Sequence, residues 1–426
     1  MKKFLAMLLA LVMALSLVAC GEQKQPDTPD VPDDGQQTAT VKVGFITLHD
    51  ENSTYDKNFI NAAKEAIANL GLTDADYILK TNVPEGQECY EAAVDMVDKG
   101  CNIIFADSFG HEPFMIQAAQ EYPNVQFCHS TGTRAHTEGL ANYHNAFASI
   151  YEGRYLAGIA AGLKLNEMID AGKFTADEAL VGYVGAYTYA EVVSGYTSFF
   201  LGVRSVCPTA TMKVTFTGSW YDEALEKEGA RKLIDMGCKL ISQHADSMGA
   251  PTACENAGIP NVSYNGSTGE ACPNTYIISS RINWAPYYEY AIKAVMDGTT
   301  IDTDWTGTLA TGSVVLTDLN TAVAAEGTAE AIAAATEKLE KGELHVFDTA
   351  TFTTRADDTM NQFKVDFLKV DADGHITSYL ADVDTDAAYT GDTEVVHDGY
   401  FAESEKRSAP YFDLEIDGIE RLDTKM

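Results

Sequence analysis

From Val41 onward, short apolar runs alternate with stretches in which apolar residues recur at helical spacing. The apolar runs predict β-strands and the periodic stretches predict amphipathic helices. A strand–helix alternation of this kind favours a parallel sheet with helices on both faces. The predicted strands are 41–46, 76–80, 102–106 and 125–127, and the predicted helices are 59–70, 89–99 and 114–121.

The same rhythm restarts after a further predicted helix at 151–165. Two α/β units in tandem leave a cleft between them, and open α/β sheets bind ligands beyond the carboxyl ends of their strands. The sequence therefore predicts an α/β protein of two Rossmann-like lobes with a ligand cleft between them. In the second unit the predicted strands are 180–184, 211–216 and 240–241, and the predicted helices are 190–206 and 222–236.

Polar and aromatic residues gather in the loops that follow these strands. Any single loop is explained by turn chemistry and helix capping. Their recurrence after successive strands favours a site that orients a flat polar ligand. The loops are 49–55, 107–112 and 129–132 in the first unit and 185–189, 218–222 and 243–247 in the second.

The chain after Glu343 is polar and acidic, and we expect residues 344–426 to form an extension packed on one lobe. Strand-like pieces occur at 363–370, 375–380 and 394–396. Asp373-Gly374 and Asp417-Gly418 predict hairpin turns.

The N-terminus is typical of a secreted protein. Lys2 and Lys3 precede an apolar stretch, Phe4–Ala14, which is short for a membrane-spanning helix. Residues 1–19 are thus predicted to be a signal peptide, with a short anchor helix as the alternative. The tetrapeptide ending at Cys20 resembles a bacterial lipobox, which implies a diacylated cysteine on the extracytoplasmic face of the cell membrane. The Pro- and Asp-rich segment 20–40 is then a lipidated, disordered tether.

Composition narrows the functional classes. Apolar residues make up 46% and aromatic residues 10% of the chain, which suits a well-packed globular protein. The net charge of −34 argues against nucleic acid and anionic membrane as partners.

Motifs for metal binding and catalysis are absent from the sequence. The cysteines show no paired spacing, and the histidines at 111, 129, 136 and 144 have no metal-ligand spacing. The Ser, His and Asp residues of 243–247 are too compressed for a hydrolase triad. We therefore expect a binding protein with no enzymatic activity, metal or cofactor.

Six ordered segments carry a family resemblance. The folded chain from Val41 to about Leu344 resembles the Bmp (basic membrane protein) family of ABC-transporter substrate-binding lipoproteins, which includes purine nucleoside receptors, and within it the branch that binds a free purine. The segments are Asn82–Gly86, Asp107–Gly110, Glu152–Gly158, Gly218–Asp222, Gln243–Ser247 and Asn283–Tyr288.

The resemblance implies a type I periplasmic-binding fold whose lobes are joined at hinge strands. It implies an N-lobe at 41–150, a C-lobe at 151–282, and a return to the N-lobe and hinge at 283–343. It also implies a monomer that delivers its ligand to an ABC permease.

The family's motif after the first strand is matched by Thr54-Tyr55-Asp56. There Tyr55 would stack on a purine and Asp56 would accept a hydrogen bond from an exocyclic amine or a ring N–H. Trp220 stands where the family has a second aromatic on the other lobe. The remaining implied ligand-binding residues are Asp246 and Ser247, a supporting His244, and Ser108 and Phe109 at the floor.

Two departures from the family pattern bear on the ligand. Ser267 and Ile282 stand where nucleoside-binding members carry an aspartate and a lysine that hold the ribose. Neither side chain can make those contacts, so an adenine-type base is favoured over a nucleoside, although Arg281 is adjacent. The alternatives are a small-molecule sensor of the same fold and, third, a nucleoside hydrolase.

Overall fold

The computed structural model describes residues 40–354, 367–381, 383 and 393–425. The predicted signal peptide, Cys20 and nearly all of the tether lie outside these residues. Within the described ranges, no helix combines the length and the apolar character needed to cross a membrane.

The first lobe is built on a six-stranded sheet in which every neighbouring pair is parallel. The central strands β1 and β3 are buried along their whole length, as expected for a sheet covered on both faces. In sheet order the strands are β11 (Asp304–Gly307), β5 (Tyr143–Ala148), β4 (Gln126–Ser130), β3 (Ile103–Ala106), β1 (Val43–Ile46) and β2 (Tyr77–Lys80).

Helices cover both faces of this sheet and create two separate cores. Helices α2 (Thr54–Asn69) and α10 (Ala285–Asp297) pack together on one core, and α3 (Gln87–Asp98) and α4 (Glu112–Glu121) on the other. The short helices η1 (Phe109–His111) and α5 (Ala135–Glu138) complete the lobe.

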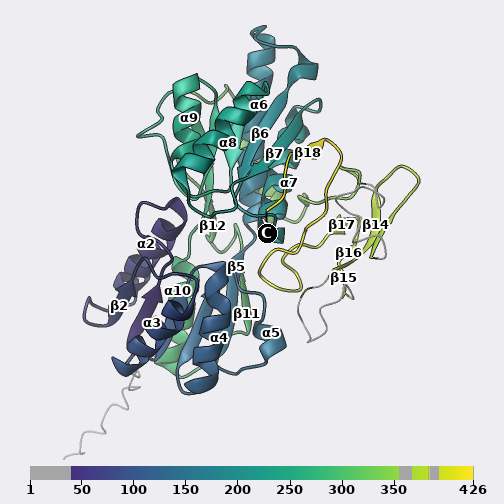
Figure 1. Ribbon diagram of the computed structural model, residues 1–426. Helices are drawn as coiled ribbons and strands as arrows, with labels where there is room; N and C mark the ends of the chain where they lie inside the picture. Colours follow the sequence, from purple (N-terminus) through teal and green to yellow (C-terminus); the bar gives the residue numbers. More distant parts are fainter. Residues whose placement is uncertain (1–39, 355–366, 382, 384–392, 426) are drawn as a thin grey trace, which may run out of the picture. The chain divides into compact units, whose positions relative to one another are not determined.

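The second lobe repeats this plan on a seven-stranded sheet (Figure 1). Its neighbouring strands are parallel except for the antiparallel pair β10–β12. In sheet order they are β12 (Val314–Leu316), β10 (Tyr276–Ile282), β9 (Asn261–Tyr264), β8 (Leu240–Gln243), β6 (Leu180–Gly185), β7 (Thr211–Phe216) and β18 (Ile419–Arg421). The helices are α6 (Ile150–Asp170), η2 (Ala176–Glu178), α7 (Ala190–Val206), α8 (Glu223–Asp235), α9 (Gly249–Ala257) and α11 (Thr328–Glu340).

Glycines allow α6 and α7 to pack backbone against backbone. A Cβ on Gly158 would lie 2.1 Å from the carbonyl oxygen of Phe199, and one on Gly202 would lie 2.0 Å from that of Tyr155. Both distances are far below van der Waals contact, so only glycine fits. The segment Glu152–Gly158 singled out in the sequence therefore contains a helix-packing residue.

The chain passes between the two sheets three times, after β5, after β10 and after β11. The three connections are bonded to one another: Ser149 N–H donates to the Gly307 carbonyl (2.8 Å) and Asn283 N–H donates to the Ser313 carbonyl (2.7 Å). Within 283–343, α10 and β11 belong to the first lobe, whereas β12 joins the second sheet and α11 packs on α6. This paired α/β architecture, with crossed connections, is the type I periplasmic-binding fold that the family resemblance implies.

The chain beyond α11 joins the core of the second lobe. Phe347, Phe352, Phe401 and Phe412 are buried in the same cluster as side chains of α6 and α7. Small antiparallel sheets form here, from β13 (Leu368–Val370), β14 (Ile376–Ala381) and β15 (Thr393–Glu394), and from β16 (Val396–His397) and β17 (Tyr400–Phe401).

Of the two hairpin turns predicted in this region, one is confirmed. Asp373-Gly374 connects the antiparallel strands β13 and β14. The hairpin predicted at Asp417-Gly418 is wrong. Gly418 does turn the chain, with φ +98°, but the strand that follows is β18, which pairs in parallel with β7 of the large sheet (Figure 1).

Candidate functional site

A narrow cavity lies between the carboxyl-end loops of the two sheets, and we call it the slot. Its volume is about 20 Å³, and residues of both lobes line it. The lining residues are Leu48, His49, Tyr55, Asp56, Ser108, Phe109 and Thr131 from the first lobe and Glu191, Trp220, His244, Asp246 and Tyr264 from the second.

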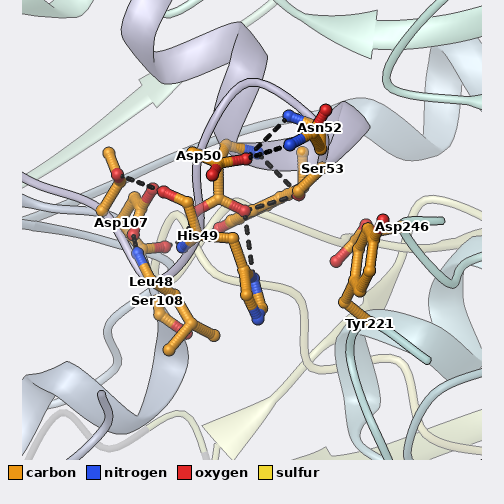
Figure 2. Close-up of polar contacts among 12 residues, drawn as sticks. Leu48, His49, Asp50, Asn52, Ser53, Asp107, Ser108, Tyr221 and Asp246 are labelled. Carbon is orange, nitrogen blue, oxygen red and sulfur yellow. Dashed lines mark hydrogen bonds and ion pairs between the residues drawn. The ribbon is translucent and has the colours of Figure 1, made fainter. Parts of the chain in front are cut away.

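The lobes touch each other around the slot. Thr54 donates both its backbone N–H and its hydroxyl to the Asp246 carbonyl, at 3.1 Å each. The rings of Phe109 and Tyr189 lie 5.2 Å apart, and those of His49 and Tyr221 lie 5.4 Å apart. Figure 2 shows the His49 loop facing Tyr221 and Asp246. The structure is thus a closed form.

The start of helix α2 fixes the position of Asp56 in the first-lobe wall. Ser53 caps the helix by accepting from Asp56 N–H, while the Ser53 hydroxyl donates to the Asp56 carboxylate at 2.5 Å. The same carboxylate accepts from His49 N–H at 2.7 Å and lies 3.4 Å from His49 Nδ1. Burial raises the pKa of Asp56, but these bonds outweigh burial and leave the pKa below its ordinary value.

Tyr55 follows on the same helix and is held at both ends. Its hydroxyl donates to the Asp107 carbonyl at 2.6 Å, and its ring packs 4.8 Å from that of Phe59. The Asp107 carboxylate is also buried and accepts from Leu48 N–H. Burial, and then the charge of Asp56, raise the pKa of Asp107 well above its ordinary value.

Ser108 and Phe109 lie in the slot, at the end of β3. The Ser108 hydroxyl donates to Glu85 at 2.5 Å, and its carbonyl is 2.7 Å from His129 Nε2. Thr131, after β4, has φ +74°, a conformation that a β-branched residue rarely adopts. Its buried hydroxyl has no hydrogen-bond partner among the described residues.

In the second-lobe wall, Trp220 and Asp246 are linked through the backbone, because Asp246 N–H donates to the Trp220 carbonyl at 3.0 Å. The Trp220 ring packs edge-on against Tyr187 at 5.1 Å. The Asp246 carboxyl accepts no hydrogen bond from any described residue. Burial, and then the charges of Asp56, Glu226 and Glu191, raise its pKa well above the ordinary value.

His244 is the best-connected side chain of this wall. Arg154 Nη2 lies 2.8 Å from His244 Nδ1, and His244 Nε2 lies 3.4 Å from the Glu191 carboxylate. Burial, and then the charge of Arg154, lower the pKa of His244 to about 4. His244 is therefore neutral at physiological pH.

The slot brings together seven of the nine ligand-binding residues predicted from the sequence. Thr54 and Ser247 do not line it. Thr54 bonds the lobes together, and Ser247 accepts from Gly249 N–H and donates its own N–H to Glu226. Among the ribose positions, Ile282 is buried in the core, Ser267 lies in a loop, and neither they nor Arg281 line the slot.

The sequence analysis did not assign five residues that line the slot: Leu48, His49, Thr131, Glu191 and Tyr264. His49 and Thr131 stand in loops that were singled out as wholes, so their placement after strands was the available signal. Glu191 lies in the first turn of α7 and Tyr264 ends β9, and nothing in their local pattern distinguishes them from cap and core residues.

The described residues hold no cluster of three or more side chains suited to a metal ion. His111 and His129 are buried against backbone carbonyls, and His136 lies near Asp304. All cysteines in the described ranges are free and buried. They serve as small core side chains.

The comparisons with known proteins agree with this fold. Residues 44–345 match the family model Bmp, described as ABC transporter substrate-binding protein PnrA-like. A purine-binding protein of Brucella abortus is 32% identical over 262 residues, which are 61% of this chain and 70% of that protein. An ABC transporter protein of Haloferax volcanii named for glucose binding is 32% identical over 269 residues, which are 63% of this chain and 64% of that protein.

Solved structures confirm the architecture. A solute-binding protein from Aeropyrum pernix superposes with a TM-score of 0.61 at 17% identity, over 76% of this chain and 96% of its own. One from Conexibacter woesei gives 0.57 at 20% identity, over 72% and 98%. Because the Bmp model covers most of the chain, this protein belongs to the Bmp family of PnrA-like substrate-binding proteins of ABC transporters.

Proposed function

We propose that this protein is the lipid-anchored, monomeric receptor of an ABC importer and that its ligand is a purine base of the adenine type. The observation that carries the proposal is that Tyr55 and Trp220 line the same slot from different lobes. Aromatic platforms of this kind contribute ~1–3 kcal/mol per stacked base. The purine-binding relative from Brucella supports the same ligand class.

Hydrogen-bonding groups in the slot suit the edge of a base. Asp246 and Glu191 offer carboxylate acceptors, and His244 and Tyr264 offer donors. Asp56 also lines the slot, but its oxygens already accept from His49 and Ser53. In this proposal Asp246 rather than Asp56 is the main acceptor for the ligand, and Tyr55 and Trp220 sandwich the ring.

A free base should bind more tightly than its nucleoside. The ribose positions Ser267 and Ile282 do not line the slot. The hydroxyls of a bound ribose would therefore lack the hydrogen bonds that these positions provide in nucleoside-binding members, each worth ~0.5–1.5 kcal/mol. We expect at least a tenfold preference for adenine over adenosine, since ~1.4 kcal/mol is a factor of ten.

Calorimetric titration of ligand-stripped protein with adenine, adenosine, guanosine, inosine and glucose tests the ligand. Glucose is included because one relative is named for it. Tighter binding of a nucleoside than of adenine would contradict the base preference. Binding of glucose alone would contradict the purine proposal.

The lipid anchor is tested by Cys20→Ser. We expect the variant to lose the acyl mass and to leave the membrane fraction, because two or more acyl chains are needed for stable anchoring. A variant that fractionates with membranes as the parent does, with its acyl mass intact, would show that Cys20 is not the anchor.

A further inference from the structure

A buried cation lies directly behind the second-lobe wall. Arg154, on α6, is only 1% exposed, and its guanidinium carbon lies 3.2 Å from the centroid of the Tyr264 ring. Its Nη1 donates to the Gln243 carbonyl at 2.9 Å. Taking a guanidinium out of water is costly, and apolar residues often replace buried charges without loss of stability. Its presence here thus calls for a role beyond stability.

The contact between Arg154 and His244 determines where the imidazole carries its proton. A guanidinium nitrogen can only donate, so His244 Nδ1, at 2.8 Å from Arg154 Nη2, must accept. A neutral imidazole that accepts at Nδ1 carries its proton on Nε2. That Nε2–H is directed toward Glu191 at the slot, where the 3.4 Å separation leaves a long and weak contact.

Every element packed around His244 is consistent with this arrangement. Tyr264 of β9 lies beneath it with ring centroids 4.8 Å apart, and Glu191 of α7 is the carboxylate that faces Nε2. Gly195 of α7 faces Nδ1, and a Cβ there would lie 2.9 Å from that atom. Glycine is less favourable than alanine inside a helix, so α7 has a weaker helix position where the imidazole comes close.

We propose that Arg154 is a positioning residue that holds His244 as an N–H donor in the slot, which makes the site specific for a planar ring with a hydrogen-bond acceptor beside a donor on one edge. This inference deepens the proposed function and rests on it for the ligand. His244 Nε2–H meets the acceptor of the ring, and the Glu191 or Asp246 carboxyl meets the donor. Adenine has this edge, with a ring nitrogen beside an amino group, whereas unsubstituted purine lacks the amino group.

The first arm of the test needs no ligand. Nitrogen NMR of the ¹⁵N-histidine-labelled full-length protein reports the proton on each ring, and His244→Gln identifies the His244 signals. We expect Nε2 protonated and Nδ1 bare in the parent, unchanged down to about pH 5. In Arg154→Met we expect mixed tautomers and a His244 pKa that rises toward the ordinary value of ~6.5 but stays below it, because the imidazole remains buried. A proton on Nδ1 in the parent, or the same spectrum in Arg154→Met, overturns the inference.

The second arm measures affinity for adenine and for unsubstituted purine. We expect Arg154→Met to weaken adenine binding about three- to tenfold, the range of one net hydrogen bond, and to narrow the preference over purine. Arg204→Met is the control, because Arg204 lies on α7 outside the slot and bonds the Asp417 carbonyl. It should change neither affinity.

The two arms separate the inference from the proposed function. If the tautomer shifts as expected but neither base binds, the role of Arg154 stands and the purine proposal fails. If adenine binds parent and variant equally and the tautomer is unchanged, the role of Arg154 fails and the purine proposal stands. Should Arg154→Met not fold, Gly195→Ala displaces the imidazole from Arg154 and is expected to release the tautomer in the same way.

Discussion

The two walls of the slot differ in how their polar groups are used. In the first-lobe wall, the Asp56 carboxylate, the Tyr55 hydroxyl and the Ser108 hydroxyl are all bonded within the protein. The exceptions are the Thr131 hydroxyl and His49 Nδ1, which have no hydrogen-bond partner among the described residues. In the second-lobe wall, the Tyr264 hydroxyl has no partner among the described residues. From the part of the chain that the structure describes, the Asp246 carboxyl accepts no hydrogen bond, and His244 Nε2 has only a long contact with Glu191.

This difference separates a shaped surface from a binding surface. Buried polar groups without partners cost ~1–3 kcal/mol each, so proteins rarely leave several together without a reason. Most polar groups of the first wall are bonded before any ligand arrives, and this wall contributes mainly the face of a ring. In the second wall a carboxyl, a phenol hydroxyl and an imidazole N–H have unused hydrogen-bonding capacity, and we infer that this wall reads the edge of the ligand.

The largest expected effect comes from removing the stacking rings. Tyr55→Ala and Trp220→Ala should each lose ~1–3 kcal/mol of adenine affinity, the range for one aromatic platform. Tyr55→Phe keeps the ring and loses only the bond to the Asp107 carbonyl, so it should bind nearly as the parent does. Calorimetry of all three variants makes the comparison, with circular dichroism to show that they fold. Unchanged affinity in both alanine variants would contradict the sandwich.

The next effect is on the free energy of unfolding, and it has opposite signs for a carboxyl of the first wall and a carboxyl of the second. Asp246 has a raised pKa in the folded protein. Its contribution to the free energy of unfolding is therefore fully present below the unfolded pKa of ~3.9 and is lost as pH rises toward the folded pKa. We expect Asp246→Asn to gain stability relative to the parent as pH rises above ~4, by at most ~1.4 kcal/mol per pH unit.

Asp56 is the opposite case, because its folded pKa is lowered. Its contribution is present above the unfolded pKa and is lost only as pH falls below ~3.9 and through the folded value. Asp56→Asn should therefore lose stability relative to the parent at neutral pH. Denaturant unfolding of both variants between pH 4 and 7 measures the signs. If the free energy of unfolding of both variants changed in the same direction relative to the parent, the distinction between the walls would be contradicted.

Sequence patterns predicted most of the architecture because the strands are short apolar runs and the helices are periodic. Strand β7 and helix α7 have the predicted limits, 211–216 and 190–206. Strands β9, β10, β11, β12 and β18 and helices α9, α10 and α11 were not predicted, and neither was strand β5. Strand β5 shows the physical reason. It is buried along its whole length although it contains His144 and Asn145, whose polar groups bond to distant residues. A local pattern carries no information about those partners.

The site shows the same division. Loops after strands could be found in the sequence because parallel strands end at a common edge. The tautomer of His244 depends on Arg154, which lies 90 residues away in the chain. The Tyr264 hydroxyl has no hydrogen-bond partner among the described residues, and this too depends on which residues pack around it in three dimensions. Neither property leaves a trace in neighbouring residues.

The smallest expected effect sharpens the comparison by separating stability from affinity. Ser53 caps α2 in the first wall, and Ser53→Ala should lower the free energy of unfolding by ~1 kcal/mol, the usual value of an N-cap. Asp222 caps α8 in the second lobe and accepts from Ala224 and Leu225 N–H, which makes Asp222→Ala a matched control. Because neither cap lines the slot, both variants should keep adenine affinity within about twofold, well inside the effect of one net hydrogen bond. Denaturant unfolding and calorimetry on the same samples provide both quantities. A loss of affinity in Ser53→Ala as large as that in Trp220→Ala would mean that the first wall contributes more to binding than the face of a ring.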